Sequence, residues 1–184
     1  MRSVCLFHQG PLEAVRRVAI DTSSRTSVAL LRLLLQARLS REPEYVPMPP
    51  DPAAMLAACD AALVIGDAAL YFDSDVRRWD LGQAWRELTG HPFVYAFWAG
   101  RPGAVQPTHV EALQVALAAG LRALPQIAQA WNTRAALGES YLRENIVFEL
   151  GPAELQGLRE FYRRAHAAGL IPRVPELRFY AQHS

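Results

Sequence analysis

A hydroxyl-rich turn, Asp21-Thr22-Ser23-Ser24-Arg25-Thr26-Ser27, has the residue types best suited to ligand chemistry. It follows a short apolar stretch and leads directly into a leucine-rich one. The first backbone N–H groups of a helix have no partner within the helix and face outward with the positive end of its dipole. A small carboxylate fits such a position, and Ser24, Thr26 and Ser27 would surround it with hydroxyls. An ordinary helix N-cap explains the same pattern without a ligand.

A second polar turn, Ile65-Gly66-Asp67-Ala68-Ala69-Leu70, follows an apolar strand-like run. Open α/β sheets bind ligands at the edge where their strands end. Gly66 permits close approach of backbone to a ligand. Asp67 would accept a hydrogen bond from a substrate hydroxyl, cap the next helical turn or pair with an arginine, and the sequence leaves these roles open.

The remaining reactive side chains do not form a recognised catalytic or metal-binding pattern. Ser3 lacks the Gly-x-Ser-x-Gly context of a hydrolase nucleophile. Cys5 and His8 are three residues apart, so in a strand their side chains leave opposite faces. The two cysteines and five histidines lack the spacing of metal ligands, so we predict no metal site.

Strands and helices alternate through the first half of the chain, and helices alone follow Gly103. This order predicts an α/β fold with a mainly parallel sheet. Strands are predicted at Ser3–Phe7, Val18–Ile20, Tyr45–Met48, Ala61–Ile65 and Phe93–Ala99. Helices are predicted at Val28–Arg38, Pro52–Cys59, between Asp80 and Gly90, and at Thr108–Ala123, Pro125–Leu137, Ser140–Val147 and Pro152–Ala168, with one helical turn at Pro11–Val15.

Composition restricts the class of protein. The 184 residues are 51% hydrophobic, which is enough for a sizeable core. The net charge of +1 gives no reason to expect a nucleic acid partner, and the pairs Arg16-Arg17 and Arg77-Arg78 are typical of solvated surface. No apolar run approaches the roughly 18 to 20 residues of a membrane span, and the first residues lack the apolar core of a secretory signal. A cytoplasmic location is the expectation.

Three blocks of sequence resemble the chorismate dehydratases of futalosine-type menaquinone synthesis. They occur in the family's order with short gaps. The blocks are Asp21–Val28, Cys59–Leu70 and the stretch from Asp80-Leu81-Gly82 through Trp85 and Leu88-Thr89-Gly90 to Pro92–Ala96 and Trp98-Ala99. The resemblance covers nearly the whole chain and weakens after Gly103.

The resemblance implies a fold like that of the type II periplasmic binding proteins, with two α/β lobes joined by two crossing strands. Residues 1–8 would form the first crossing strand and 9–92 the complete second lobe. Residues 93–99 would form the second crossing strand, and 100–184 would return to the first lobe as helices. Family members carry a further amino-terminal segment, so lobe one would be incomplete in these residues, and activity of this chain alone is in question.

The resemblance also implies the reaction. A hydro-lyase of this family removes water from chorismate to give 3-[(1-carboxyvinyl)oxy]benzoate without a cofactor. The family uses a serine on the first crossing strand, which Ser3 matches, and an asparagine in the part of lobe one that this chain lacks. Substrate binding would fall to Ser24, Thr26, Ser27, Gly66 and Asp67. The alternatives are a solute-binding protein of the same fold, or the sister enzyme that makes 1,4-dihydroxy-6-naphthoate.

Overall fold

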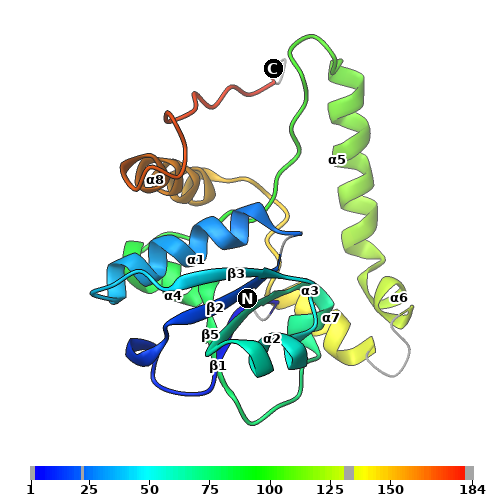
Figure 1. Cartoon of the computed structure of the whole chain (residues 1–184). Coiled ribbons are helices and arrows are strands. Elements are labelled where there is room, and N and C mark those ends of the chain that lie inside the picture. Colours follow the sequence, from blue (N-terminus) through cyan, green and yellow to red (C-terminus); the bar gives the residue numbers. More distant parts are fainter. Residues whose placement is uncertain (1–2, 22, 131–134, 181–184) are drawn as a thin grey trace. The chain divides into compact units, whose positions relative to one another are not determined.

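The computed structural model describes residues 3–21, 23–130 and 135–180 (Figure 1). The chain divides into two compact units. The first comprises Met1–Tyr95 and Gly151–Val174, and the second comprises Ala96–Leu150 and Pro175–Ser184.

A five-stranded sheet forms the centre of the first unit, with the strand order β3-β2-β4-β1-β5. Strand β2 runs parallel to β3 and β4, whereas β1 runs antiparallel to both of its neighbours, β4 and β5. The α/β prediction is confirmed, but the expectation of a mainly parallel sheet is wrong for β1. The strands are β1 (Val4–His8), β2 (Arg17–Asp21), β3 (Glu44–Met48), β4 (Ala61–Ile65) and β5 (Arg77–Asp80).

This topology brings five chain segments to one edge of the sheet. Because β5 is antiparallel to β1, and β1 to β4, strands β2, β3, β4 and β5 all point in the same direction. Their carboxyl ends therefore lie at the edge where β1 begins. This is the edge at which open α/β sheets bind ligands.

Helices α1, α4 and α8 belong to the larger of two hydrophobic clusters, on one face of the sheet. Helix α1 contributes Leu30, Leu31 and Leu34, whose three- and four-residue spacing produces an apolar stripe. Trp85 of α4 and Phe161 of α8 join this cluster, and each lies edge-to-face with Phe93. The helices are α1 (Arg25–Arg38), α4 (Leu81–Thr89) and α8 (Pro152–Ala167).

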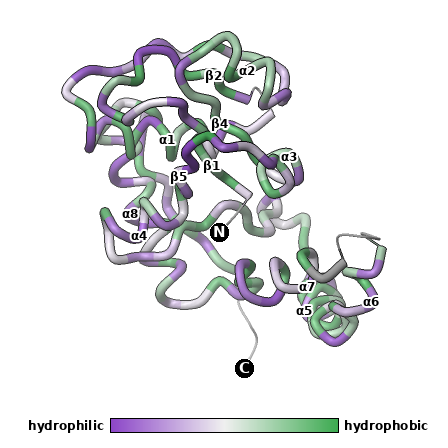
Figure 2. The backbone as a smooth tube through the Cα atoms, turned by 90° about the horizontal axis from the view of Figure 1, so that it is seen from below, coloured by the Kyte–Doolittle hydropathy of each residue, from purple (hydrophilic) through white to green (hydrophobic). Residues whose placement is uncertain are grey.

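Two short helices, α2 (Pro52–Ala58) and α3 (Gly66–Leu70), contribute to the smaller cluster on the opposite face. Met55 of α2 and Ala69 of α3 are fully buried there with Cys5 and Phe7 of β1. In Figure 2 the tube is hydrophobic along β1 and β4, the strands between these two clusters. A single 3-10 turn, Leu12–Ala14, precedes β2 as predicted.

The second unit contains helices α5 (Pro107–Arg122), α6 (Leu124–Gln129) and α7 (Ala135–Glu144). Leu124 and Ala128 of α6 are buried, and α6 packs on α7. Helix α5 buries no residue although much of its sequence is apolar (Figure 2). Within the described residues, no helix combines the length and apolar character that a membrane crossing requires.

The structure differs from the sequence-based expectation at residues 93–99, which form no strand. Phe93 and Tyr95 instead pack their rings against the larger hydrophobic cluster. β-branched and aromatic residues favour strands only where a neighbouring strand can pair with them, and in the described residues none pairs with this segment. The division of the chain into lobes remains a prediction.

The Arg77-Arg78 pair is exposed, as expected for solvated surface, and it begins the edge strand β5. Arg78 Nε lies 3.1 Å from Cys5 Sγ, and the guanidinium lies over the Phe7 ring. A long arginine side chain can cover apolar surface while its charged end stays wet. Because charged residues can occupy such a strand in this way, a short charged strand at the edge of a sheet is hard to detect from its sequence.

The carboxyl-terminal half is helical as expected, but two helices have different boundaries. The helix expected to continue to Leu137 ends at Gln129, and α7 begins at Ala135, earlier than the expected Ser140. Helix α8 packs on α1 and belongs to the unit that contains the sheet.

An ion-pair cluster on α8 makes the stability of the fold depend on pH in the acidic range. Arg163 and Arg164 each donate hydrogen bonds to Glu160 at 2.7 Å, and these bonds, Arg163 first, lower the pKa of Glu160 from 4.5 to about 2. A lowered folded-state pKa stabilises the fold above the unfolded pKa, and this contribution is lost as pH falls from about 4.5 towards 2.

We therefore expect Glu160→Gln to reduce the loss of unfolding free energy between pH 5.5 and pH 3. Urea titrations of both proteins at each pH measure this loss. Glu154→Gln on the same helix, where the described residues include no ion-pair partner, should retain the wild-type acid dependence. Equal acid dependence in all three proteins would contradict the expectation.

Candidate functional site

Three neighbouring strands place predicted site residues at the edge of the sheet where β2, β4 and β5 end. Ser3 immediately precedes β1, Gly66 follows β4, and the hydroxyl-rich turn follows β2. The Gly66 N–H donates to the Ser3 carbonyl oxygen at 2.7 Å, which places these two positions side by side. Because β4 lies between β1 and β2, the edge from Ser3 to the end of β2 spans two strand spacings, roughly 10 Å.

The start of α1 supplies donors at this edge. Ser24 is the N-cap residue, and its Oγ accepts the Ser27 N–H at 3.3 Å. The backbone N–H groups of Arg25 and Thr26 precede the first intrahelical bond. Ser27 is only 4% exposed, and its hydroxyl has no hydrogen-bond partner within the described residues. The N-cap role is thus confirmed for Ser24, while the N–H groups of Arg25 and Thr26 lie outside the intrahelical hydrogen bonds.

The charge of this helix start is unusual. No acidic residue lies in the first turn of α1, and exposed Arg25 occupies its first position. A cation there opposes the helix dipole, which favours negative groups at the amino end. The arrangement therefore does not serve the helix itself, and it suits an anion bound at the amino end of α1.

Asp21 holds the turn between β2 and α1. Its Oδ1 accepts the Ser23 N–H at 2.8 Å, and its carbonyl oxygen accepts the Ser24 N–H at 3.4 Å. The side chain is 2% exposed. Sequence reasoning included Asp21 in the hydroxyl-rich turn but gave its side chain no role. A carboxylate directly after an apolar run, at the start of a hydroxyl-rich turn, is the signal that would have identified it.

The third segment of the edge is the turn into α3. Gly66 has a φ of 64°, in the left-handed region that favours glycine. Asp67 is exposed in the first turn of α3, where its charge suits the helix dipole. Its carboxylate neither caps the helix nor pairs with an arginine among the described residues. Of the three roles considered, the substrate hydroxyl is the one that stays open.

The site residues lie on both faces of the sheet. Ser24, Thr26 and Ser27 begin α1, which contributes to the larger hydrophobic cluster. Alternation along β1 puts Ser3 on the face of Cys5 and Phe7, where α3 also packs. A ligand that touches both groups must therefore lie across the edge. Thr22, between β2 and α1, lies outside the described residues.

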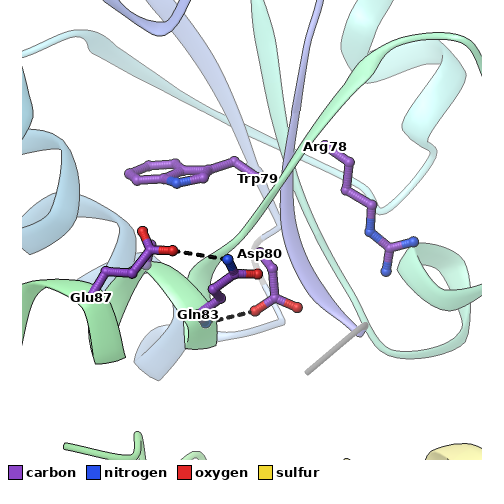
Figure 3. A pocket seen from close by; sticks show the side chains of 6 residues that line it. Arg78, Trp79, Asp80, Gln83 and Glu87 are labelled. Atoms are coloured by element: carbon purple, nitrogen blue, oxygen red, sulfur yellow. Dashed lines mark hydrogen bonds between the residues drawn. The ribbon is translucent and has the colours of Figure 1, made fainter. Parts of the chain in front are cut away.

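A separate cavity of about 220 Å³ lies beside β5 and the start of α4 (Figure 3). Gln83 links the two carboxylates of the cavity. The backbone N–H of Gln83 donates to Asp80, and its side-chain Nε2 donates to Glu87, both at 2.9 Å. Figure 3 shows Arg78 directed away from Trp79. None of the predicted site residues lines this cavity, and its paired carboxylates disfavour an anionic ligand. The lining residues are Arg78, Trp79, Asp80, Gln83, Ala84 and Glu87.

The cysteines have the environment of small core residues, as predicted. Cys5 and Cys59 are both buried, and neither takes part in a disulfide among the described residues. Burial raises the pKa of each thiol above its ordinary value. A raised pKa keeps a thiol protonated and weakly nucleophilic, so neither cysteine suits covalent catalysis.

Comparison with known proteins identifies relatives over almost the whole chain. A family described as menaquinone biosynthesis matches residues 1–167. The chain is 34% identical, over 190 aligned residues, to a protein named chorismate dehydratase from Thermus thermophilus. The alignment covers 91% of this chain and 68% of that protein.

The family match includes every segment of the candidate site, from Ser3 through the turn at Gly66. It also extends past the sheet into α8. The sequence resemblance, which rested on three short blocks, is confirmed. The chain belongs to the menaquinone-biosynthesis family.

Proposed function

We propose that this chain is a chorismate dehydratase that removes water from chorismate to give 3-[(1-carboxyvinyl)oxy]benzoate. The observation that carries the proposal is the 34% identity to a chorismate dehydratase over 91% of the chain. The donor-rich start of α1, at the ligand-binding edge of an α/β sheet, supports it, because chorismate carries two carboxylates.

The proposed reaction places simple demands on the protein. The ring carbon that bears the enolpyruvyl group loses a proton, and the C–O bond to the neighbouring hydroxyl breaks. The electrons of the C–H bond form the new ring double bond, and the hydroxyl leaves with a proton as water. Because the product ring is aromatic, the reaction is driven without a cofactor. The protein must orient the ring, hold the carboxylates and assist proton movement.

The proposed binding mode follows the edge of the sheet. One carboxylate meets the start of α1, where Ser24, Thr26 and Ser27 surround the free N–H groups. The ring lies across the end of β4, beside Gly66 and Asp67. Ser3 at the start of β1 places a hydroxyl at the far end, for the substrate or the departing water. The span of roughly 10 Å from β2 to β1 suits a six-membered ring with its substituents.

In the same proposal, the unit that contains the sheet is the second lobe of a two-lobed fold like that of type II periplasmic binding proteins. The antiparallel course of β1 within an otherwise parallel sheet supports this arrangement. A strand that enters from another lobe runs opposite to strands connected within the lobe. Residues 1–8 would then be a crossing strand and 9–92 the body of the lobe.

The direct test is to incubate the purified chain with chorismate and follow the carboxyvinyloxybenzoate by chromatography and mass. We expect a product to accumulate whose mass is lower than that of chorismate by one water molecule. Calorimetric titration runs in parallel. Binding of chorismate without conversion would favour the solute-binding alternative. If chorismate is neither bound nor converted, the proposal is contradicted.

The carboxylate position can be tested without weakening the helix. Ser24→Asp and Ser24→Asn both retain a good N-cap, but only aspartate adds a negative charge beside the bound carboxylate. We expect Ser24→Asp to weaken chorismate binding about 10-fold or more, which is about 1.4 kcal/mol. Ser24→Asn should bind nearly as the parent does. Calorimetry gives both affinities, and equal affinities would remove the start of α1 from the site.

A further inference from the structure

Arg25 places a positive charge at the start of α1 that the helix itself does not use. It occupies the first helical position and is exposed. Within the described residues its side chain forms no ion pair or hydrogen bond. A cation at the amino end opposes the helix dipole, whereas an acidic residue there would stabilise the helix. The role of Arg25 must therefore lie outside α1.

The other charges at this edge of the sheet are negative. Among the described residues in the first four positions after β2, β3, β4 and β5, Arg25 is the one cation. Asp67 follows β4, and Asp21 and Asp80 are the last residues of β2 and β5. These carboxylates repel a ligand that carries two negative charges. A dianion at this edge therefore needs a cation, and Arg25 supplies one.

The proposed binding mode provides for one of the two carboxylates of chorismate. The free N–H groups at the start of α1 surround it together with Ser27, which is 4% exposed and whose hydroxyl has no hydrogen-bond partner within the described residues. The ring hydroxyl of chorismate lies opposite the ring carboxylate, in agreement with its place beside Asp67 and Ser3. The carboxylate of the enolpyruvyl group is left without a partner.

The position of Arg25 suits this second carboxylate. A helical side chain tilts toward the amino end of its helix, so at the first position the guanidinium extends past the free N–H groups. In chorismate, one ring carbon separates the carbon that bears the ring carboxylate from the carbon that bears the enolpyruvyl group. A long side chain beside the first carboxylate can therefore reach the second. The planar guanidinium binds a carboxylate through two parallel hydrogen bonds.

We propose that Arg25 binds the enolpyruvyl carboxylate and thereby makes the site selective for a dicarboxylate. This inference rests on the proposed function and deepens it. The start of α1 holds the ring carboxylate through N–H and hydroxyl donors, and Arg25 holds the second carboxylate through its charge. Because chorismate and the proposed product both carry this carboxylate, the stable product reports on the contact without turnover.

The test compares two ligands that differ by this one carboxylate. They are the product, 3-[(1-carboxyvinyl)oxy]benzoate, and 3-vinyloxybenzoate, with dissociation constants from calorimetry and from displacement of the product. We expect wild type to bind the dicarboxylate about 10-fold more tightly. Arg25→Gln, which removes the cation but keeps a good helix former, should bind the two ligands almost equally. Arg25→Lys keeps the charge without the planar fork and should lie between them.

The matched control is Arg41→Gln. Arg41 is also exposed and unpaired within the described residues, but it lies beyond the carboxyl end of α1. This variant loses the same charge and should keep the wild-type preference. Thermal unfolding separates binding from folding: because Arg25 opposes the helix dipole, Arg25→Gln should unfold at the same temperature as wild type or up to about 4 °C higher.

Each outcome decides the inference. If wild type prefers the dicarboxylate and Arg25→Gln keeps this preference, Arg25 is not its partner, and the inference fails while the proposed function stands. Equal weakening of both ligands in Arg25→Gln would assign Arg25 to the ring carboxylate and overturn the inference as well. The same holds if wild type binds the two ligands equally. If wild type binds neither chorismate nor the product, the proposed function fails and the inference fails with it.

Discussion

Replacing Trp85 by alanine is expected to lower the free energy of unfolding by about 3–5 kcal/mol, the range for large aromatic residues in protein cores. Trp85 is completely buried in the cluster formed by α1, α4 and α8. Its ring lies 5.4 Å from Phe93 and 6.2 Å from Phe161, edge-to-face in both pairs. Alanine would remove these contacts and leave a cavity where three segments distant in sequence meet.

Urea unfolding followed by far-ultraviolet circular dichroism measures the effect. Trp85→Phe is the informative second variant, because the buried indole N–H finds no acceptor in the described residues. Phenylalanine removes this unsatisfied N–H group, and that gain offsets part of the packing energy lost with the larger ring. We therefore expect a smaller destabilisation than for alanine. Trp98→Ala is the control, since Trp98 is 84% exposed, and its effect should stay within about 0.5 kcal/mol. A Trp85→Ala protein as stable as the Trp98→Ala protein would contradict the packing described here.

Local signals made most of the first unit predictable from sequence. Asp51 before Pro52 predicted the start of α2, and the structure shows Asp51 Oδ1 accepting two N–H groups there. Gly90 predicted the end of α4, where it adopts the left-handed conformation of a helix C-cap. These signals are reliable because each depends only on residues within one turn of the element that it ends.

The errors concern elements that depend on distant partners. Strand β5 is four residues long and starts with two arginines, so it exists because β1 pairs with it and not because of its own pattern. Residues 93–99 have the composition of a strand but pack through the rings of Phe93 and Tyr95. Strand propensity describes how well a side chain fits a paired surface, and a single sequence does not say which surface is present.

The candidate site was predicted in part, for a related reason. The hydroxyl-rich turn is continuous in sequence, so Ser24, Thr26 and Ser27 were found from their spacing before a helix. The buried, turn-holding role of Asp21 was not predicted, because its burial depends on the strands around it. The contact between Ser3 and Gly66 depends on the register of β1 against β4. Ser3 was singled out by family resemblance, since nothing in its neighbouring residues marks it.

Gly157→Ala should destabilise the protein by about 3 kcal/mol, at the upper end of the range for overpacking. A Cβ added at this position of α8 would overlap the Pro92 carbonyl oxygen and lie 3.5 Å from the Cβ of His91. The obstacle is backbone, which cannot rotate aside as a flexible side chain can. Either α8 or the segment that follows α4 must move.

Such a movement would disturb the aromatic cluster around Phe93, because Phe93 follows Pro92 directly and contacts Phe161 one turn further along α8 at 5.0 Å. The close approach at Gly157 is therefore a condition for the packing that buries Trp85. We expect the effects of Gly157→Ala and Trp85→Ala on the free energy of unfolding to be non-additive in the double variant, because both disturb the same packed cluster.

Gly120→Ala on α5 is the control, because a Cβ there meets no atom within 4 Å. It should stabilise its helix by up to about 1 kcal/mol through helix propensity alone. Thermal and urea unfolding of the two alanine variants should thus shift in opposite directions. A Gly157→Ala protein with raised stability would mean that α8 does not approach Pro92 in solution. It would then contradict the burial of Phe161 in the larger hydrophobic cluster.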